Sequence, residues 1–227
     1  IGGNADYRVD PGKDDLFRRV IELRQSVKVA MKQASGEEAE ALDTEQNALK
    51  ICANATSYGI WVEVNVATRR NRVATTVHSS TAQPFSFATD KAEEPGPFFS
   101  PLLATLITGA ARLMLAIAEK LVSNCGLEWA FCDTDSMAIA KPEPLSISDF
   151  YERVQGIVDW FAGLNPYSFG GSILKVESEN ASLTTGEPEP LYCWAVSAKR
   201  YALFNLSPDR QPIMRKVSAH GLGHLRP

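Results

Sequence analysis

The sequence predicts a mixed α+β fold in which a pair of helices precedes a set of short antiparallel strands. Apolar residues recur at the helical period over residues 14–32. A hydrophobic strand pattern at 127–132 runs into a four-residue polar turn and continues as a second apolar segment at 137–140. Further strand patterns, separated by short breaks, fill 191–218. With 227 residues, 44% of them apolar, the chain can bury a core as one large domain or two small ones.

The first helix is predicted over residues 13–33. Its apolar positions are spaced by three or four residues and form one stripe: Leu16, Val20, Leu23, Val27 and Met31. Asp14 and Asp15 stand near its N-terminus, where the helix dipole favours negative charge. Arg24 and Lys28 lie about one turn apart beside the stripe. These features predict an amphipathic helix with two basic side chains next to its buried face.

A second helix is predicted over 44–57, beginning at Thr44. The small and acidic residues of 34–43 would link it to the first helix, so that the two helices run antiparallel. Lys50 and Asn54 are four residues apart and project from one face of this helix. A cation together with an amide donor suits a triphosphate. With the basic pair of the first helix, they would line a basic cleft between the two helices.

Strands at 58–66, 73–79 and 84–89 are predicted next, followed by a long helix over 101–123 packed against the sheet. This helix is apolar enough to raise the question of a membrane span. However, Arg112 stands in its middle, and a charge at that depth costs about 3 kcal/mol on insertion scales. We therefore expect a buried helix and no membrane partner.

Two carboxylates stand two residues apart in the turn Asp133-Thr134-Asp135-Ser136. Like charges this close repel each other, and a divalent cation with oxygen ligands relieves the repulsion. Magnesium bound together with a phosphate is the first expectation. Asp and Ser are also ordinary turn residues whose side chains bond their own backbone, so the turn alone is equally typical of a plain hairpin.

The C-terminal third is predicted as a helix over 148–163, capped by Ser148, and four strands. The strands lie near 172–179, 191–197, 200–206 and 213–218. The four cysteines form no Cys-x-x-Cys pair, which indicates neither a zinc site nor a disulfide framework. A net charge of -4 argues against nonspecific nucleic-acid binding by the whole surface.

The Asp-Thr-Asp-Ser turn between two apolar strands resembles the palm motif of family B DNA polymerases, in which an aspartate holds catalytic metal. The resemblance implies that Asp135 is the main catalytic and metal-binding carboxylate and Asp133 the auxiliary one. Near the end of the chain, residues 197–204, SAKRYALF, resemble the family's Lys-Lys-Arg-Tyr segment at the primer end. The DNA-binding residues implied are Lys199, Arg200 and Tyr201.

Two further segments resemble the fingers of the same family. Residues 49–65, LKICANATSYGIWVEVN, resemble the motif that binds the incoming nucleotide, and the matching residues are Lys50, Asn54 and Tyr58. Here the Tyr-Gly pair comes one residue later than is usual in the family, so either Asn54 or Tyr58 is displaced. The pair Arg24 and Lys28 resembles the first fingers helix and would also bind nucleotide. Finally, residues 173–179 look like the palm strand that brings another carboxylate to the metal, supplied by Glu177 or Glu179. The third metal ligand expected is Glu179.

The resemblance implies part of a template-directed DNA polymerase that transfers a nucleotide from a deoxynucleoside triphosphate to a primer 3′-hydroxyl by a two-metal mechanism. The cofactor would be Mg²⁺, or alternatively Mn²⁺. We expect an N-terminal loop and fingers over 1–66, a palm over 67–206, and at 207–227 a palm end leading toward a missing or minimal thumb. The expected partners are primer-template DNA, deoxynucleoside triphosphates and the missing N-terminal part of the polymerase. The expected location is the cytoplasm, the nucleoid or a phage-infected cell, without secretion.

Two features depart from a complete polymerase. The family's other metal aspartate lies in an Asp-x-x-Ser-Leu-Tyr-Pro segment that has no match between Ile1 and Asp15, and no exonuclease domain is present. The chain also begins with Ile, so we expect a fragment that is inactive by itself. Two alternatives remain open. One is a nucleotide-sugar glycosyltransferase, which would use the Asp-x-Asp turn but needs alternating strands and helices before it. The other is a non-catalytic DNA-binding remnant of a polymerase.

Overall fold

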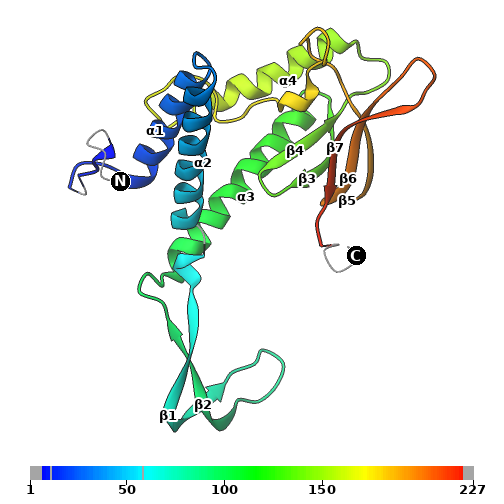
Figure 1. The fold of residues 1–227 in the computed structure, drawn as a ribbon. Helices are drawn as coiled ribbons and strands as arrows, with labels where there is room; N and C mark the ends of the chain where they lie inside the picture. The colour runs from blue at the N-terminus through cyan, green and yellow to red at the C-terminus, as the bar shows by residue number, and fades with distance from the viewer. Residues whose placement is uncertain (1–6, 11, 58, 222–227) are drawn as a thin grey trace. The chain divides into compact units, whose positions relative to one another are not determined.

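The computed structural model describes residues 7–10, 12–57 and 59–221. Among these residues there are four α-helices and seven strands, and every paired strand is antiparallel, which confirms the predicted mixed α+β class. The chain divides into two compact units, residues 1–110 and 111–227. The boundary falls inside helix α3 (Pro101–Asn124). Figure 1 shows the elements in chain order.

The first unit begins with two helices, α1 (Leu16–Met31) and α2 (Glu37–Ser57), which pack as an antiparallel pair (Figure 1). Asp15 caps α1, because its side chain accepts a hydrogen bond from the backbone N–H of Arg18 at 3.0 Å. The buried residues between the helices are Val20, Leu23, Val27 and Leu49. Three of these four belong to the predicted apolar stripe, so the amphipathic helix is confirmed.

Helix α2 begins at Glu37, earlier than the predicted start at Thr44. Acidic residues occupy its first turn, where they favour the positive end of the helix dipole. Gly36, at a φ of +59°, allows the chain to turn into this earlier start. The acidic segment interpreted as a link is therefore largely helical.

A short 3-10 turn, η2 (Ile60–Val62), leads into a two-stranded antiparallel ribbon of β1 (Val64–Val77) and β2 (Phe85–Pro95). The prediction of separate strands at 58–66 and 73–79 is wrong, because β1 runs through both segments. Its register shifts between Thr68 and Val73, where three arginines replace the apolar alternation on which the prediction relied.

In the second unit, α4 (Ile147–Ala162) and the part of α3 from residue 111 onward pack around one core. The buried residues of this core are Ala118, Val122, Leu127, Phe150, Val154, Ile157 and Phe161. The strands β3 (Glu128–Asp133) and β4 (Ser136–Ala140) form a hairpin, and Met137 and Ile139 of β4 pack against the core. The predicted packing of the long helix against the hairpin that carries the acidic turn is therefore confirmed.

The N-cap of α4 is Ser146, not the predicted Ser148. The Ser146 hydroxyl accepts a hydrogen bond from the backbone N–H of Asp149 at 3.0 Å. Ser148 lies inside the first turn. The sequence offers two serines here, and the one three residues before an acidic residue provides the cap.

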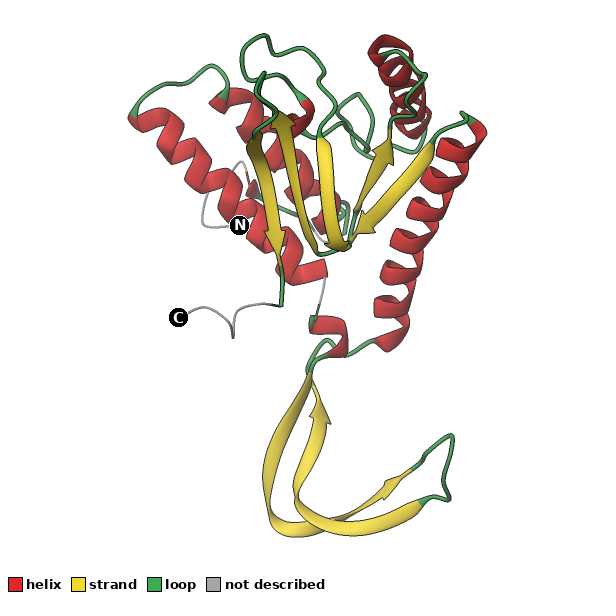
Figure 2. Ribbon diagram, turned by 90° about the vertical axis from the view of Figure 1, so that its right-hand side faces the viewer, coloured by secondary structure: helices red, strands yellow, loops and turns green. Residues whose placement is uncertain are grey.

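Strands β5 (Tyr192–Ser197), β6 (Arg200–Leu206) and β7 (Pro212–Ala219) form a three-stranded antiparallel sheet with β6 in the centre. It lies beside the β3–β4 hairpin in Figures 1 and 2. The rings of Phe131 in β3 and Tyr201 in β6 meet with their centroids 4.7 Å apart. The side chains thus join two sheets that share no strand pairing among the described residues.

The predicted strand near 172–179 is wrong. The segment is irregular and ends in a 3-10 turn, η3 (Ser178–Asn180). At its end, the carbonyls of Glu179 and of Ala181 just beyond it accept hydrogen bonds from the side chain of Arg215 in β7. Two glycines, Gly170 and Gly171, precede it and favour a loop.

Among the described residues, α3 is the one helix long and apolar enough to cross a membrane by length and composition. Core helices of soluble proteins share these properties. Of α3, Ala118 and Val122 are buried, both in the core of the second unit, and most of the other residues of the helix are exposed. The expectation of a buried helix is therefore wrong for most of its length.

Candidate functional site

The β3–β4 turn presents two carboxylates at the tip of a tight hairpin. Asp133 pairs with Ser136, which leaves Thr134 and Asp135 as the two loop residues. The Ser136 hydroxyl donates to the carbonyl of Asp133 at 3.0 Å, and the backbone N–H of Asp135 donates to the same carbonyl at 2.8 Å. Thr134 has a φ of +59°, an uncommon conformation for a β-branched residue. The turn is thus closed by its own hydrogen bonds and holds a strained residue between its aspartates.

A hollow of about 770 Å³ opens at this turn. It is lined by segments far apart in the sequence, namely the turn, the irregular segment before η3, the β5–β6 turn and the end of β7. Its charged and titratable side chains, apart from a tyrosine, are Asp133, Asp135, Glu177, Lys199, Lys216 and His220. Three carboxylates therefore share one hollow with two lysines and a histidine.

The two aspartates of the turn differ in their surroundings. The ammonium group of Lys199 donates to Asp133 Oδ1 at 2.8 Å and to the hydroxyl oxygen of Thr134 at 2.8 Å. The Thr134 hydroxyl lies 3.1 Å from Asp133 Oδ1. The Asp133 side chain is only 14% exposed, and the hydrogen bond from Lys199 holds its pKa below the ordinary value despite opposing burial. The Asp135 carboxylate has no hydrogen-bond or ion-pair partner within the described ranges, so it is the one open to a ligand.

The oxygen donors of this hollow fit a hard divalent cation. Mg²⁺ is bound through one or two carboxylates together with substrate phosphates, whereas a self-contained cage needs more ligands. Asp135 and Glu177 line the hollow and could supply such carboxylates. In the part of the chain that the structure describes, no cluster of three or more His, Cys, Asp or Glu side chains could hold a metal alone. The fit to a cation thus rests on the chemistry of the Asp135 and Glu177 carboxylates, which are the kind of donor that Mg²⁺ takes in proteins.

Of the two glutamates considered from the sequence, Glu177 lines the hollow. Glu179 instead forms an ion pair with Lys216, with Oε1 and Nζ 3.2 Å apart. A hydrogen bond from its own backbone N–H is the main cause that lowers the pKa of Glu179, and Lys216 adds to it. Glu177 thus lines the hollow at the turn, while the role of Glu179 as a metal ligand stays a prediction.

Arg215 of β7 fixes the segment that carries Glu177. Its side chain is 6% exposed and donates to the carbonyls of Glu179 at 2.9 Å and Ala181 at 2.6 Å. It also donates to Asn205 Oδ1 at 2.6 Å. Arg215 was not predicted as a site residue, because a lone arginine in a strand gives no signal of burial in the sequence.

The β5–β6 turn brings the predicted DNA-binding residues to the same hollow. The carbonyl of Lys199 accepts hydrogen bonds from the His220 N–H at 3.2 Å and the Ser218 hydroxyl at 3.1 Å. Arg200 Nε donates to the carbonyl of His220 at 3.2 Å, and its side chain is exposed. Tyr201 is only 9% exposed and packs on Phe131. Lys199 and Arg200 are thus reachable from solvent, whereas the ring of Tyr201 contributes to packing.

The predicted nucleotide-binding residues lie in the first unit. Arg24 Nε donates to Gln46 Oε1 at 3.3 Å across the helix pair, and Lys50 follows Gln46 by one turn of α2. Because the helices are antiparallel, Lys28 lies farther along α1 in the direction away from Lys50. Lys50 and Asn54 are both exposed.

The helices pack directly on each other through apolar side chains. Tyr58 lies outside the described residues. Arg24 is thus level with Gln46, and Lys50 lies one helical turn from that level on α2.

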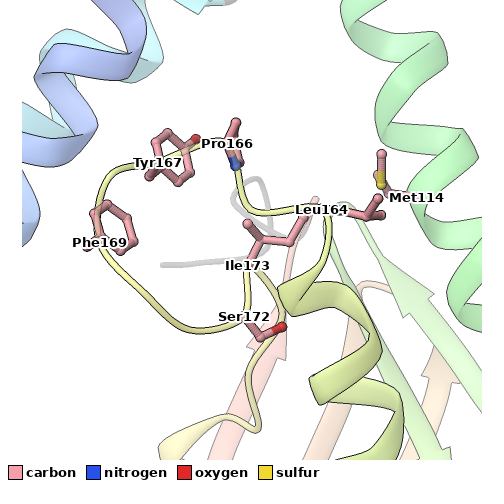
Figure 3. Close-up of a pocket in the computed structure, with 7 residues that line it drawn as sticks. All are labelled: Met114, Leu164, Pro166, Tyr167, Phe169, Ser172 and Ile173. Carbon is pink, nitrogen blue, oxygen red and sulfur yellow. The ribbon is translucent and has the colours of Figure 1, made fainter.

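A second cavity, of about 410 Å³, lies in the second unit beside the loop after α4 (Figure 3). The rings of Tyr167 and Phe169 stack there with their centroids 5.1 Å apart. Asn165 organises the loop by donating to the carbonyls of Phe169 and Gly171. The lining is mostly apolar and lacks converging charged groups, so it does not resemble a catalytic site.

Comparison with models of known protein families gives no match for this chain, and comparison with curated proteins gives none either.

Proposed function

We propose that this chain is the fingers and palm part of a template-directed DNA polymerase that resembles family B. One observation carries the proposal. The turn that presents Asp135 opens into the same hollow as Lys199, which contacts the turn across 66 positions of sequence. These are the two segments that the resemblance assigns to the metal and to the primer end. Two motifs matched separately in the sequence thus converge on one site.

In this proposal the side chains divide the work of nucleotidyl transfer. Asp135 and Glu177 hold the cation-bound triphosphate at the hollow, and Lys199 and Arg200 face the primer backbone. For the first unit, the resemblance assigns Arg24 and Lys50 to nucleotide phosphate through charge-assisted hydrogen bonds. Bound divalent cations would stabilise the charge that develops on the transferred phosphoryl group. The second carboxylate segment comes, in the proposal, from a part of the polymerase outside residues 1–227.

The glycosyltransferase alternative has less support. It needs alternating strands and helices before the Asp-x-Asp turn, which is the pattern of a parallel sheet. The pairs formed by the described strands are antiparallel, and an antiparallel helix pair and ribbon precede the turn. We therefore retain the polymerase proposal.

The test is nucleotide incorporation by a polypeptide that joins residues 1–227 to the upstream palm segment. Asp135→Asn should abolish incorporation while far-UV circular dichroism stays unchanged. Asp159→Asn, on the exposed face of α4, is the matched control and should retain activity. Incorporation by the Asp135 variant at more than a small percentage of the parental rate would falsify the proposal. Primer-template binding without any incorporation by the parent would instead favour the DNA-binding remnant.

A further inference from the structure

We propose that Lys199 is a positioning residue of the carboxylate turn. Its ammonium group neutralises Asp133 and holds Thr134 in the left-handed conformation, so that Asp135 remains as the carboxylate that meets a divalent cation. This inference rests on the proposed function of the turn. It gives Lys199 a role separate from any contact with DNA.

The geometry of the ammonium group supports this role. Its distances to Asp133 Oδ1 and to the Thr134 hydroxyl oxygen are both 2.8 Å, so one cation joins two neighbouring residues of the turn. The contact with Thr134 restrains a residue whose φ of +59° is uncommon for a β-branched side chain. The contact with Asp133 decides how the turn meets a cation, because it neutralises one of the two carboxylates and leaves Asp135 open.

The position of Lys199 is itself fixed by the sheet. Its carbonyl is bound by the backbone of His220 and the hydroxyl of Ser218 at the end of β7. Lys199 belongs to the two-residue turn between Ser197 and Arg200, which are paired across β5 and β6. The ammonium group therefore extends from a strand scaffold to the turn.

The arrangement makes a prediction opposite to that for a simple metal ligand. Lys199 places a positive charge beside the site where a cation would bind, and its ion pair with Asp133 keeps that carboxylate from the cation. Removing that charge frees Asp133 to attract the cation. Two unit charges 4 Å apart in water interact by about 1 kcal/mol, which corresponds to about a five-fold change in affinity. A divalent cation should respond at least as strongly.

The experiment is a titration of the 227-residue chain with Mn²⁺, followed by electron paramagnetic resonance of the free ion at low ionic strength. Lys199→Met should tighten Mn²⁺ binding about five-fold or more, whereas Lys199→Arg, which keeps the charge, should stay near the parent. Lys120→Met removes the same charge from an exposed position on α3 and should change nothing. Unchanged or weaker binding in Lys199→Met, with native circular dichroism, overturns the inference.

Two aspartate variants keep the test decisive if Lys199→Met does not fold. Asp133→Asn should weaken Mn²⁺ binding much less than Asp135→Asn, because Lys199 already neutralises Asp133. Equal losses in the two variants overturn the inference. If Asp135→Asn leaves Mn²⁺ binding intact, the proposed metal function of the turn fails. If Asp135 is required and Lys199→Met has no effect, only the role of Lys199 fails.

Discussion

Replacing Arg215 by Met should strongly destabilise the second unit, because Arg215 is a buried arginine of the three-stranded sheet. The side chain is 6% exposed, and its guanidinium group forms hydrogen bonds with two backbone carbonyls and the side chain of Asn205. Methionine fills a similar volume but donates no hydrogen bond. The carbonyls of Glu179 and Ala181 would then lose their partner.

The expected magnitude follows from those contacts. A hydrogen bond to a charged group contributes about 1.5–3 kcal/mol, and such values do not add fully within one network. Glu189 lies 3.7 Å away and is 40% exposed, so its separation from Arg215 costs little. We expect a loss of about 3–4 kcal/mol in the free energy of unfolding. This loss is a large part of the stability of a typical domain, about 5–15 kcal/mol.

Urea unfolding of the chain measures the loss, followed by circular dichroism and tryptophan fluorescence so that separate unfolding of the two units is detected. With a slope of about 2 kcal/mol per molar urea, the midpoint should fall by about 1.5–2 M. Arg112→Met, at an exposed position on α3, is the control and should leave the midpoint nearly unchanged. Arg215→Lys should fall between them, because lysine keeps the charge but lacks the planar fork. A midpoint for Arg215→Met equal to that of the control would refute the assignment of Arg215 as an anchor.

Three further predictions concern other sites. Lys50→Ala should raise the apparent dissociation constant for a deoxynucleoside triphosphate by about ten-fold, because one charge-assisted contact is lost, and DNA affinity should change little. A fall in DNA binding with unchanged nucleotide affinity contradicts the fingers proposal. Lys199 lowers the pKa of the Asp133 carboxyl in the folded state. The pair therefore stabilises the fold at pH values above the pKa that Asp133 has in the unfolded chain, and this contribution is lost as the pH falls through the pKa in the folded chain. NMR titration of the carboxyl should show protonation at lower pH in the parent than in Lys199→Met, and identical titrations rule out the pairing. Arg210 has a φ of +57°, a left-handed conformation that glycine adopts without steric cost, so Arg210→Gly should raise the free energy of unfolding in urea by about 1 kcal/mol. A loss of stability would show that contacts of the Arg210 side chain outweigh the relief of its backbone.

The helices and hairpins were largely predictable because their signals are local. The stripe of α1 and the paired apolar segments around the acidic turn each depend on residues within a few positions, and both form as expected. Boundaries were less predictable. Thr44 and Ser148 both look like caps in the sequence, yet Gly36 and Ser146 begin those helices because the acidic residues that follow them suit the first turn.

The site was predictable in its residues but not in its contacts. Asp133, Asp135 and Lys199 were each marked by a local motif. The ion pair between Asp133 and Lys199 joins residues 66 positions apart, and no periodicity encodes such a contact. Arg215 left no sign at all, because its role comes from carbonyls of an irregular segment that was predicted as a strand.

The Asp-Thr-Asp-Ser turn has two interpretations, a purely structural hairpin turn and a turn that binds a cation. A structural turn explains Ser136, whose hydroxyl bonds the backbone, and Asp133, which is neutralised by Lys199. It does not explain why Asp135 has no partner among the described residues while Glu177 lines the same hollow on a segment anchored by a buried arginine. Solvation alone would satisfy an isolated exposed aspartate. Two carboxylates that line one hollow are the donors that a cation shared with a phosphate would use. The metal proposal therefore depends on Asp135 together with Glu177, and Glu177→Gln should weaken Mn²⁺ binding to the chain. Unchanged affinity in that variant would leave Asp135 as a solvated turn residue and return the hairpin to a purely structural role.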